Sequence, residues 1–157
     1  MTTVADFVGR RIDLSLFSNV PTVENDNRLL VHAMSVNGVA TVCTGVQKLA
    51  QRVLMRLFTV KGSRRYQPDE GCLFMADAAK GVFRSTANVV ASFAAARTDI
   101  LIQFAAERYD TDPLDEVLVD LRLDNVLLAL DGVAITVRIT TAAGSTRKLI
   151  APLPIVI

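Results

Sequence analysis

Residues 54–73, LMRLFTVKGSRRYQPDEGCL, indicate how the chain is organised. The stretch begins as the end of an amphipathic helix and then contains two turns, separated by a basic segment. Gly62 follows the last periodic apolar residue, where a left-handed helix C-cap favours a residue without Cβ. Pro68 fixes φ at the first central position of the second turn, and Gly71 suits its closing position. We therefore expect a helix followed by two sharply defined turns.

Residues 44–58 are predicted to form that helix. Thr44 and Gln47 fit a capping box, in which each side chain satisfies the backbone N–H of the other residue. Apolar residues recur at spacings of three and four and form a broad stripe: Val46, Leu49, Ala50, Val53, Leu54 and Leu57. The opposite face carries the polar residues Lys48, Gln51, Arg52 and Arg56. Taken alone, those polar residues indicate a solvated face.

A second long helix is predicted from Ser85 to about Arg108. Its inward positions are expected to be Val89, Val90, Phe93, Ala96, Ile100, Leu101 and Phe104. The alanines between them give high helix propensity and a thin surface, which allows another element to approach closely. A shorter helical segment is expected at residues 73–80, before Gly81.

From Leu114 onward the apolar period changes to two, which predicts strands. The alternation places Val117, Val119, Leu121 and Leu123 on one face. Turns are expected at Asp124-Asn125, Asp131-Gly132 and 142–145, and a last strand at 147–153. Pro152 and Pro154 cannot both donate to a central ladder, so this strand is expected at an edge or outside the sheet. The three apolar residues after it either fold back on the chain or dock on another one.

The N-terminal third is less regular. Residues 28–43 predict a hairpin that turns at Asn37-Gly38 and contains the single histidine, His32. Residues 1–27 fit either a packed strand and loop or an extended arm, and the first is favoured. The fold class is therefore α+β, with two main helices packed on an antiparallel β-hairpin and a C-terminal antiparallel meander sheet. The 157 residues are expected to form one domain.

Composition excludes several function classes. The net charge of +1 argues against a general electrostatic grip on nucleic acid. No apolar run appears long enough to span a bilayer, and no signal peptide is expected, so neither a membrane partner nor export is predicted. Cys43 and Cys72 are expected to be buried thiols, with a disulfide left open. Hydrophobic residues make up 51%, which suggests both a core and contacts with other chains.

A search for catalytic chemistry finds little. No nucleophile elbow or phosphate-binding loop is present, and one histidine cannot build a multi-histidine metal site. Paired carboxylates for glycan hydrolysis would have to come from Glu70, Glu107, Asp110 and Asp112, and the sequence contains no tryptophan to hold sugar rings. We therefore expect no enzymatic activity, no cofactor and no metal.

The ordered set of motifs resembles the small baseplate wedge proteins of contractile phage tails, the lysozyme-like sheath-initiator family that is also found in type VI secretion. The matching residues are Gln51-Arg52, Leu57-Phe58-Thr59, Gly62 and Pro68-Asp69-Glu70-Gly71. Glu107-Arg108 stands where the family usually has Glu-Pro-Arg, although here no proline separates the two residues. The resemblance covers residues 44–147.

The resemblance implies a structural subunit of the virion tail baseplate, assembled in the host cytoplasm. Its partners would be other wedge proteins, the tail sheath protein and a tube or hub protein, and it would template the first sheath ring by strand addition. The residues expected to bind partners are Arg52, Arg56, Arg64, Arg65, Glu107, Arg108, Arg147, Leu149 and Leu153. The alternatives are a lysozyme-like peptidoglycan hydrolase and a cytoplasmic protein-binding adaptor.

Overall fold

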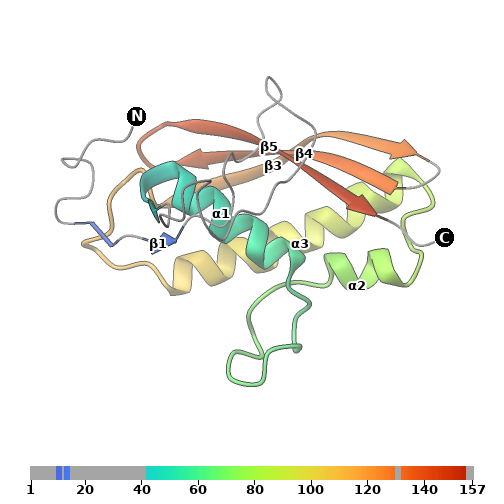
Figure 1. The fold of residues 1–157 in the computed structure, drawn as a ribbon, viewed down its shortest axis with the longest axis horizontal. Coiled ribbons are helices and arrows are strands. Elements are labelled where there is room, and N and C mark those ends of the chain that lie inside the picture. Colours follow the sequence, from blue (N-terminus) through green and yellow to red (C-terminus); the bar gives the residue numbers. More distant parts are fainter. Residues whose placement is uncertain (1–9, 12, 15–41, 130–131, 155–157) are drawn as a thin grey trace, which may run out of the picture.

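The chain forms a layer of helices against a three-stranded antiparallel sheet, which confirms the α+β class (Figure 1). The structure, a computed structural model, describes residues 10–11, 13–14, 42–129 and 132–154. The helices are α1 (Gly45–Phe58), α2 (Phe74–Ala79) and α3 (Thr86–Ala106). The strands are β1 (Asp13–Leu14), β2 (Val42–Cys43), β3 (Leu118–Ala129), β4 (Gly132–Thr141) and β5 (Thr146–Pro154).

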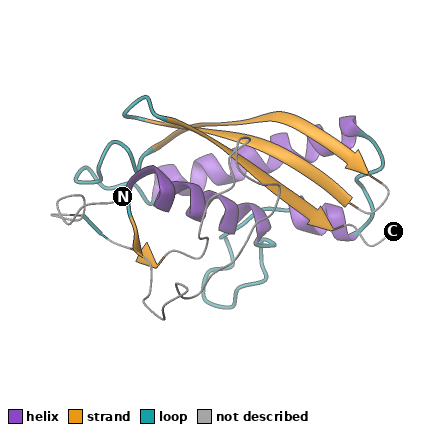
Figure 2. Ribbon diagram, turned by 45° about the horizontal axis from the view of Figure 1, so that its top comes forward, coloured by secondary structure: helices purple, strands orange, loops and turns teal. Residues whose placement is uncertain are grey.

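Strand β4 lies in the middle of the main sheet, with β3 and β5 as its antiparallel neighbours. All three helices lie on one face of this sheet, as the turned view in Figure 2 also shows. The side chains of β4 that point toward the helices are buried: Val133, Ile135, Val137 and Ile139. They join the apolar stripe of α1 and the inner face of α3 in one core. The loop after α1 projects from the helix layer, away from the sheet (Figures 1 and 2).

Strand β3 differs from its predicted pattern because it contains two bulges. Its register with β4 shifts between Leu118 and Asp120 and again between Leu123 and Asn125. The first shift turns Val119 outward, where it is 56% exposed, while Leu118 packs against the core. The second shift absorbs the residues expected to form a turn, so β3 continues through them. A β-bulge inserts one residue and thereby re-aims the side chains beyond it, which period-two reasoning does not anticipate.

The two long helices agree with the sequence in extent and in most of their buried apolar positions. The predicted solvated face of α1 is wrong in three of its four residues, because Lys48, Gln51 and Arg56 are buried. In α3, Val89, Phe93, Ala96, Ile100 and Phe104 are buried, whereas Val90 is exposed, contrary to prediction. The Ser85 side chain accepts a hydrogen bond from the Asn88 N–H at 3.3 Å, as expected of an N-cap. The short helix α2 forms within the expected range.

Helix α3 is long and apolar enough to cross a membrane by length and composition alone, with a mean hydropathy of 1.4. The expectation that no segment reaches that length is therefore wrong for residues 86–106. In this fold α3 packs along the sheet, and its Arg97 Nε donates to the Leu121 carbonyl of β3 at 2.7 Å. Only 28% of the apolar window is buried, so much of the outer surface of α3 is apolar and exposed.

Several predictions fall outside the described residues. These are the hairpin at Asn37-Gly38, His32, the choice between arm and strand for residues 1–27, and the fate of residues 155–157. At the edge of this region, β1 and β2 form a short antiparallel pair, with Asp13 opposite Cys43. The β3–β4 ladder runs as far as the Ala129–Gly132 pair, next to the predicted Asp131-Gly132 turn.

Candidate interaction sites

The C-terminal end of α1 carries a guanidinium that the sequence alone places on a solvated face. Arg56 is instead buried, with 5% of its side chain exposed. Its Nη2 donates to Glu107 Oε2 at 2.5 Å, and the same oxygen accepts from Arg52 Nη2 at 2.9 Å. Glu107 is the C-cap residue of α3, where a carboxylate meets the negative end of the helix dipole. The two arginines of α1 supply the positive charge that this position requires.

A second carboxylate extends the cluster into the loop after α1. Glu70 Oε1 lies 3.7 Å from Arg56 Nε, and its Oε2 accepts from Arg64 Nη1 at 2.5 Å. Arg56 therefore bridges the loop and the end of α3. We call Arg52, Arg56, Arg64, Glu70 and Glu107 the arginine–glutamate cluster. Charge-assisted hydrogen bonds of this kind fix geometry as well as adding energy.

The cluster also rests on an aromatic ring. Arg56 Cζ lies 4.2 Å and Arg52 Cζ 4.9 Å from the ring centroid of Phe104, within the range of cation–π attraction. One donor remains without a partner among the protein atoms, because Arg56 Nη1 is buried and makes no hydrogen bond. The cluster thus makes many contacts, but one of its hydrogen-bond donors is not satisfied.

The loop itself is held at both of its predicted turns. Gly62 has φ +84 and Gly71 has φ +92, so both adopt the left-handed conformation that favours glycine. The predicted C-cap role of Gly62 is wrong, because α1 ends earlier, with an extended Thr59 as its C-cap. Gln67 and Glu70 close a turn around Pro68 by a 3.2 Å hydrogen bond, which leaves Gly71 just beyond it. Gly71 has no room for a side chain, since a Cβ there would lie 2.3 Å from the Thr59 carbonyl oxygen.

Helix α3 clamps the base of the loop with one amide. Gln103 Nε2 donates to the Gly71 carbonyl at 2.7 Å, and Gln103 Oε1 accepts from the Gly71 N–H at 3.1 Å. The thiol of Cys72 contacts the carbonyls of Arg56 and Leu57, and burial raises its pKa to about 11. Both cysteines are free and buried, as expected. The loop is therefore a preformed projection.

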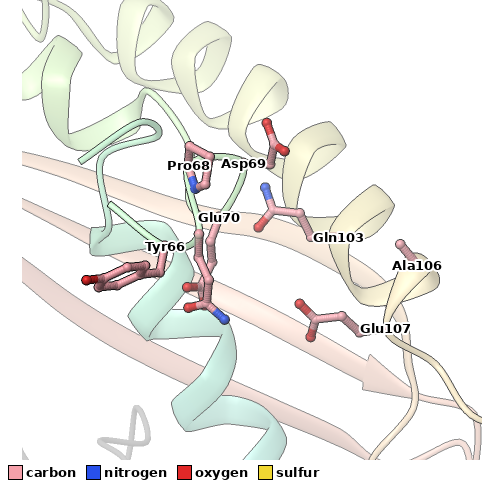
Figure 3. A pocket seen from close by; sticks show the side chains of 8 residues that line it. Tyr66, Pro68, Asp69, Glu70, Gln103, Ala106 and Glu107 are labelled. Atoms are coloured by element: carbon pink, nitrogen blue, oxygen red, sulfur yellow. The ribbon is translucent and has the colours of Figure 1, made fainter. Parts of the chain in front are cut away.

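A groove of about 320 Å³ separates this loop from the last turn of α3 (Figure 3). Its lining residues are Tyr66, Gln67, Pro68, Asp69, Glu70, Gln103, Ala106 and Glu107. Two of the carboxylates considered for catalysis lie here, but Glu70 and Glu107 each contact a guanidinium. Both carboxylates are therefore held in ion pairs with arginines of α1 and of the loop after it.

The remaining predicted partner residues of the loop and of α3 are at the surface. Tyr66 at the loop tip is 88% exposed, and the Arg65 guanidinium lies 5.7 Å from its ring centroid. Arg108 is exposed and does not pair with the neighbouring Glu107. It lines a separate groove of about 180 Å³. The proposed Glu107-Arg108 unit is therefore divided: Glu107 is half exposed and pairs with the arginines of α1, whereas Arg108 is exposed without pairing to Glu107.

The predicted partner residues of the last strand lie on β5. Arg147 is exposed, whereas the side chains of Leu149 and Leu153 are buried in the core. Neither leucine side chain is available to a partner in this fold, so contact there would have to use the backbone. β5 is an outer strand of the sheet, as its prolines indicate.

Sequence reasoning missed a second charged group, at the N-terminal end of α1. The buried Glu116 accepts hydrogen bonds from Thr44 Oγ1 at 2.9 Å, from the Gly45 N–H at 2.9 Å and from Lys48 Nζ at 2.7 Å. The Thr44 side chain makes no cap hydrogen bond within the helix, so the predicted capping box is wrong. Burial alone would raise the pKa of Glu116, but these donors outweigh it and hold the pKa below its ordinary value. No spacing in the sequence pointed to this external cap, because Glu116 lies 71 residues after Gly45.

Among the described residues, no three His, Cys, Asp or Glu side chains are arranged to hold a metal ion. Comparisons with protein-family models, with curated proteins and with solved structures find no match to this chain.

Proposed function

We propose that this chain is a structural subunit that binds other proteins through an open sheet edge, and that its assembly is the baseplate of a contractile tail. The kind of assembly rests on the resemblance of residues 44–147 to the sheath-initiator family. The chain would join the wedge to the hub beside the tube and template the first sheath ring. Its partners are wedge proteins, the sheath protein and a tube or hub protein.

One observation carries the structural role: β5 is a regular strand that, among the described residues, is paired on one side only. It pairs with β4 from Thr146 to Pro154 without a register shift, and no other described strand pairs with it. The other outer strand, β3, is interrupted by its two bulges. Bulges discourage strand pairing, whereas a regular edge offers a row of backbone donors and acceptors to an incoming strand. β5 is therefore the edge suited to strand addition.

The helix layer offers a second contact. The outer surface of α3 exposes Ala91, Ala94, Ile102 and Ala105, and none of them is charged. Beside it, the arginine–glutamate cluster fixes the projecting loop with Arg65 and Tyr66 at its tip. Tyr and Arg often contribute strongly to protein interfaces. A wedge helix would pack against α3 and contact this loop.

The test is co-expression of the chain with the sheath, wedge and tube proteins of the tail to which it would belong. We expect co-purification with the sheath protein, and loss of that complex when β5 is blocked by Lys148→Pro. As a control, Arg122→Glu on β3 should leave the complex intact. A reconstruction of the baseplate that places this chain away from both sheath and wedge would refute the proposal.

The hydrolase alternative has a separate test. Purified protein should not clear a suspension of cell walls, and Glu70→Gln and Glu107→Gln should make no difference. Clearing that both substitutions abolish would replace the structural role with catalysis. Stable co-purification with a protein unrelated to tails would favour the adaptor.

A further inference from the structure

The hydrogen-bonding alternation of β5 defines which of its backbone groups face outward. At the β4–β5 turn, the Thr141 N–H donates to the Ser145 carbonyl at 2.9 Å, so this pair is hydrogen-bonded. Bonded and non-bonded pairs alternate along an antiparallel ladder. Thr140–Thr146 is then a non-bonded pair and Ile139–Arg147 a bonded one. The even-numbered residues of β5 direct their N–H and C=O groups away from β4.

The prolines agree with this assignment and limit the open segment. Pro152 and Pro154 are even-numbered, so the donors they lack are outward ones and the β4–β5 ladder is intact. The outward N–H groups are therefore those of Thr146, Lys148 and Ile150. An incoming strand can accept hydrogen bonds from these three residues and from none beyond them.

The charges beside this segment indicate the chemistry of the partner. Lys148 lies opposite Arg138 of β4 in the ladder. Arg138 pairs with Asp124 of β3, its Nη2 lying 2.6 Å from Asp124 Oδ2. Like charges directly opposite each other destabilise a sheet. The β3 residue opposite Arg138 is Arg122, so three positive charges lie side by side in one row of the ladder. Arg122 pairs with Asp120 and Arg138 with Asp124, whereas the exposed Lys148 has no carboxylate partner among the described residues. A carboxylate on a fourth strand would supply the partner that Lys148 lacks.

The same residues oppose pairing between two copies of this chain. Antiparallel pairing of two β5 edges centred on the open segment would set Lys148 against Lys148. The exposed Arg147 beside it adds further positive charge. Since like charges on facing strands repel, the edge is protected against self-association while it remains open to an acidic strand.

From this geometry we infer that the β5 edge binds one extended acidic segment of another protein, over Thr146–Ile150, with a carboxylate opposite Lys148. This inference rests on the proposed function and names the chemistry of the partner segment. Backbone hydrogen bonds set the register of that segment, and Pro152 ends the pairing. Charge then selects the partner.

The test uses two synthetic seven-residue peptides with capped ends, Thr-Val-Glu-Val-Glu-Val-Thr and the same sequence with Lys in place of Glu. Amide hydrogen exchange is followed by NMR on the full chain. In the free protein we expect fast exchange at Thr146, Lys148 and Ile150, and slow exchange at Arg147 and Leu149. The acidic peptide should slow the first three amides and bind about tenfold more tightly than the basic peptide.

Charge and backbone are separated by two variants. Lys148→Glu should reverse the preference between the peptides while the alternating exchange pattern stays. Lys148→Pro removes an outward N–H that does not bond to β4, so the chain should fold but bind neither peptide. Arg122→Glu, on the other edge, should leave the preference for the acidic peptide unchanged.

The outcomes distinguish this inference from the function on which it rests. Equal binding of both peptides would overturn the acidic preference and leave strand addition standing. Slow exchange at all five amides in the free chain would show an occupied edge and overturn both. Self-association that Lys148→Glu weakens would overturn the protection argued from like charge.

Discussion

The two ends of helix α1 use charge in opposite ways. At its N-terminal end Glu116 is buried, accepts three hydrogen bonds and pairs with Lys48 in one closed group. At its C-terminal end Arg56 is shared by two carboxylates, of which Glu107 is 48% exposed, and one guanidinium nitrogen has no partner. In the first group Lys48 also donates to the Arg11 carbonyl at 2.8 Å, but among the described residues Lys48 is the one cation that forms an ion pair with Glu116. The second group contains three arginines and two glutamates, so it has one positive charge in excess. Removing one of its side chains should therefore cost little stability, and a carboxylate from a partner could join it.

The largest effect on stability is expected when the buried ion pair between Glu116 and Lys48 is lost. Glu116→Ala leaves Lys48 buried without its carboxylate, and we expect a loss of about 3–5 kcal/mol in the free energy of unfolding. Glu107→Ala, at the open end, should cost about 1 kcal/mol or less, because Glu107 is half exposed. Urea unfolding at pH 7, followed by circular dichroism, measures both. Equal losses would show that the two ends do not differ.

The second effect concerns the loop at the open end. Gly71→Ala should cost about 2–4 kcal/mol, because its φ is +92 and the new Cβ would meet the Thr59 carbonyl. Gly62→Ala is the matched control, with φ +84 and nothing within 4 Å of the added Cβ. It should cost only about 1–2 kcal/mol. If thermal unfolding gave the two variants the same stability, the close approach of Gly71 to the Thr59 carbonyl would not contribute to the cost of the substitution.

The third effect is a pH dependence of stability that arises from Glu116, at the N-terminal end of α1. Because the pKa of Glu116 in the fold lies below its ordinary value of 4.5, the fold gains stability from this group above that pH. The gain is lost as the pH falls through the folded pKa. Stability measured from pH 6 downward should therefore fall more steeply for the natural chain than for Glu116→Gln. If stability fell equally with pH in the natural chain and in Glu116→Gln, the pH dependence would not come from Glu116.

The smallest effect is expected from Arg56→Met. Glu107 keeps Arg52 and Glu70 keeps Arg64 as partners, and the unpaired nitrogen is removed. Stability should change by about 1 kcal/mol or less, in either direction. Lys48→Met, which leaves Glu116 without a cation, should cost about 3 kcal/mol. Chemical unfolding measures the free energy of unfolding of both variants. Equal losses for Arg56→Met and Lys48→Met would show that the two ends of α1 do not differ.

Local signals made the helices, the last strand and the two turn glycines predictable. The spacing of apolar residues fixed α1 and α3, and the prolines placed β5 at an edge. The bulges of β3 were not predictable, because a bulge changes which residue of an adjacent pair faces the core without changing composition. Val119 and Leu118 are equally apolar, and only pairing with β4 decides between them.

The candidate sites show the same division. Arg52, Arg56 and Glu107 could be singled out as charged residues near helix ends, but their mutual contact joins segments 51 residues apart in the Arg56–Glu107 pair. Glu116 gave no signal, because its partners lie 68 to 72 residues earlier. Contacts over such separations depend on the assembled fold and cannot be inferred from spacing.

The two free thiols lie beside the two ends of α1. Cys43 Sγ contacts Gln51 near the first turns, and Cys72 contacts the carbonyls of the last turn. Burial raises the pKa of each thiol to about 11, so neither reacts readily while the fold is closed. An alkylating reagent would label each cysteine only when its own end of the helix opens. The natural chain thus carries two internal reporters, and mass spectrometry can follow the opening of each end separately, without any engineered probe.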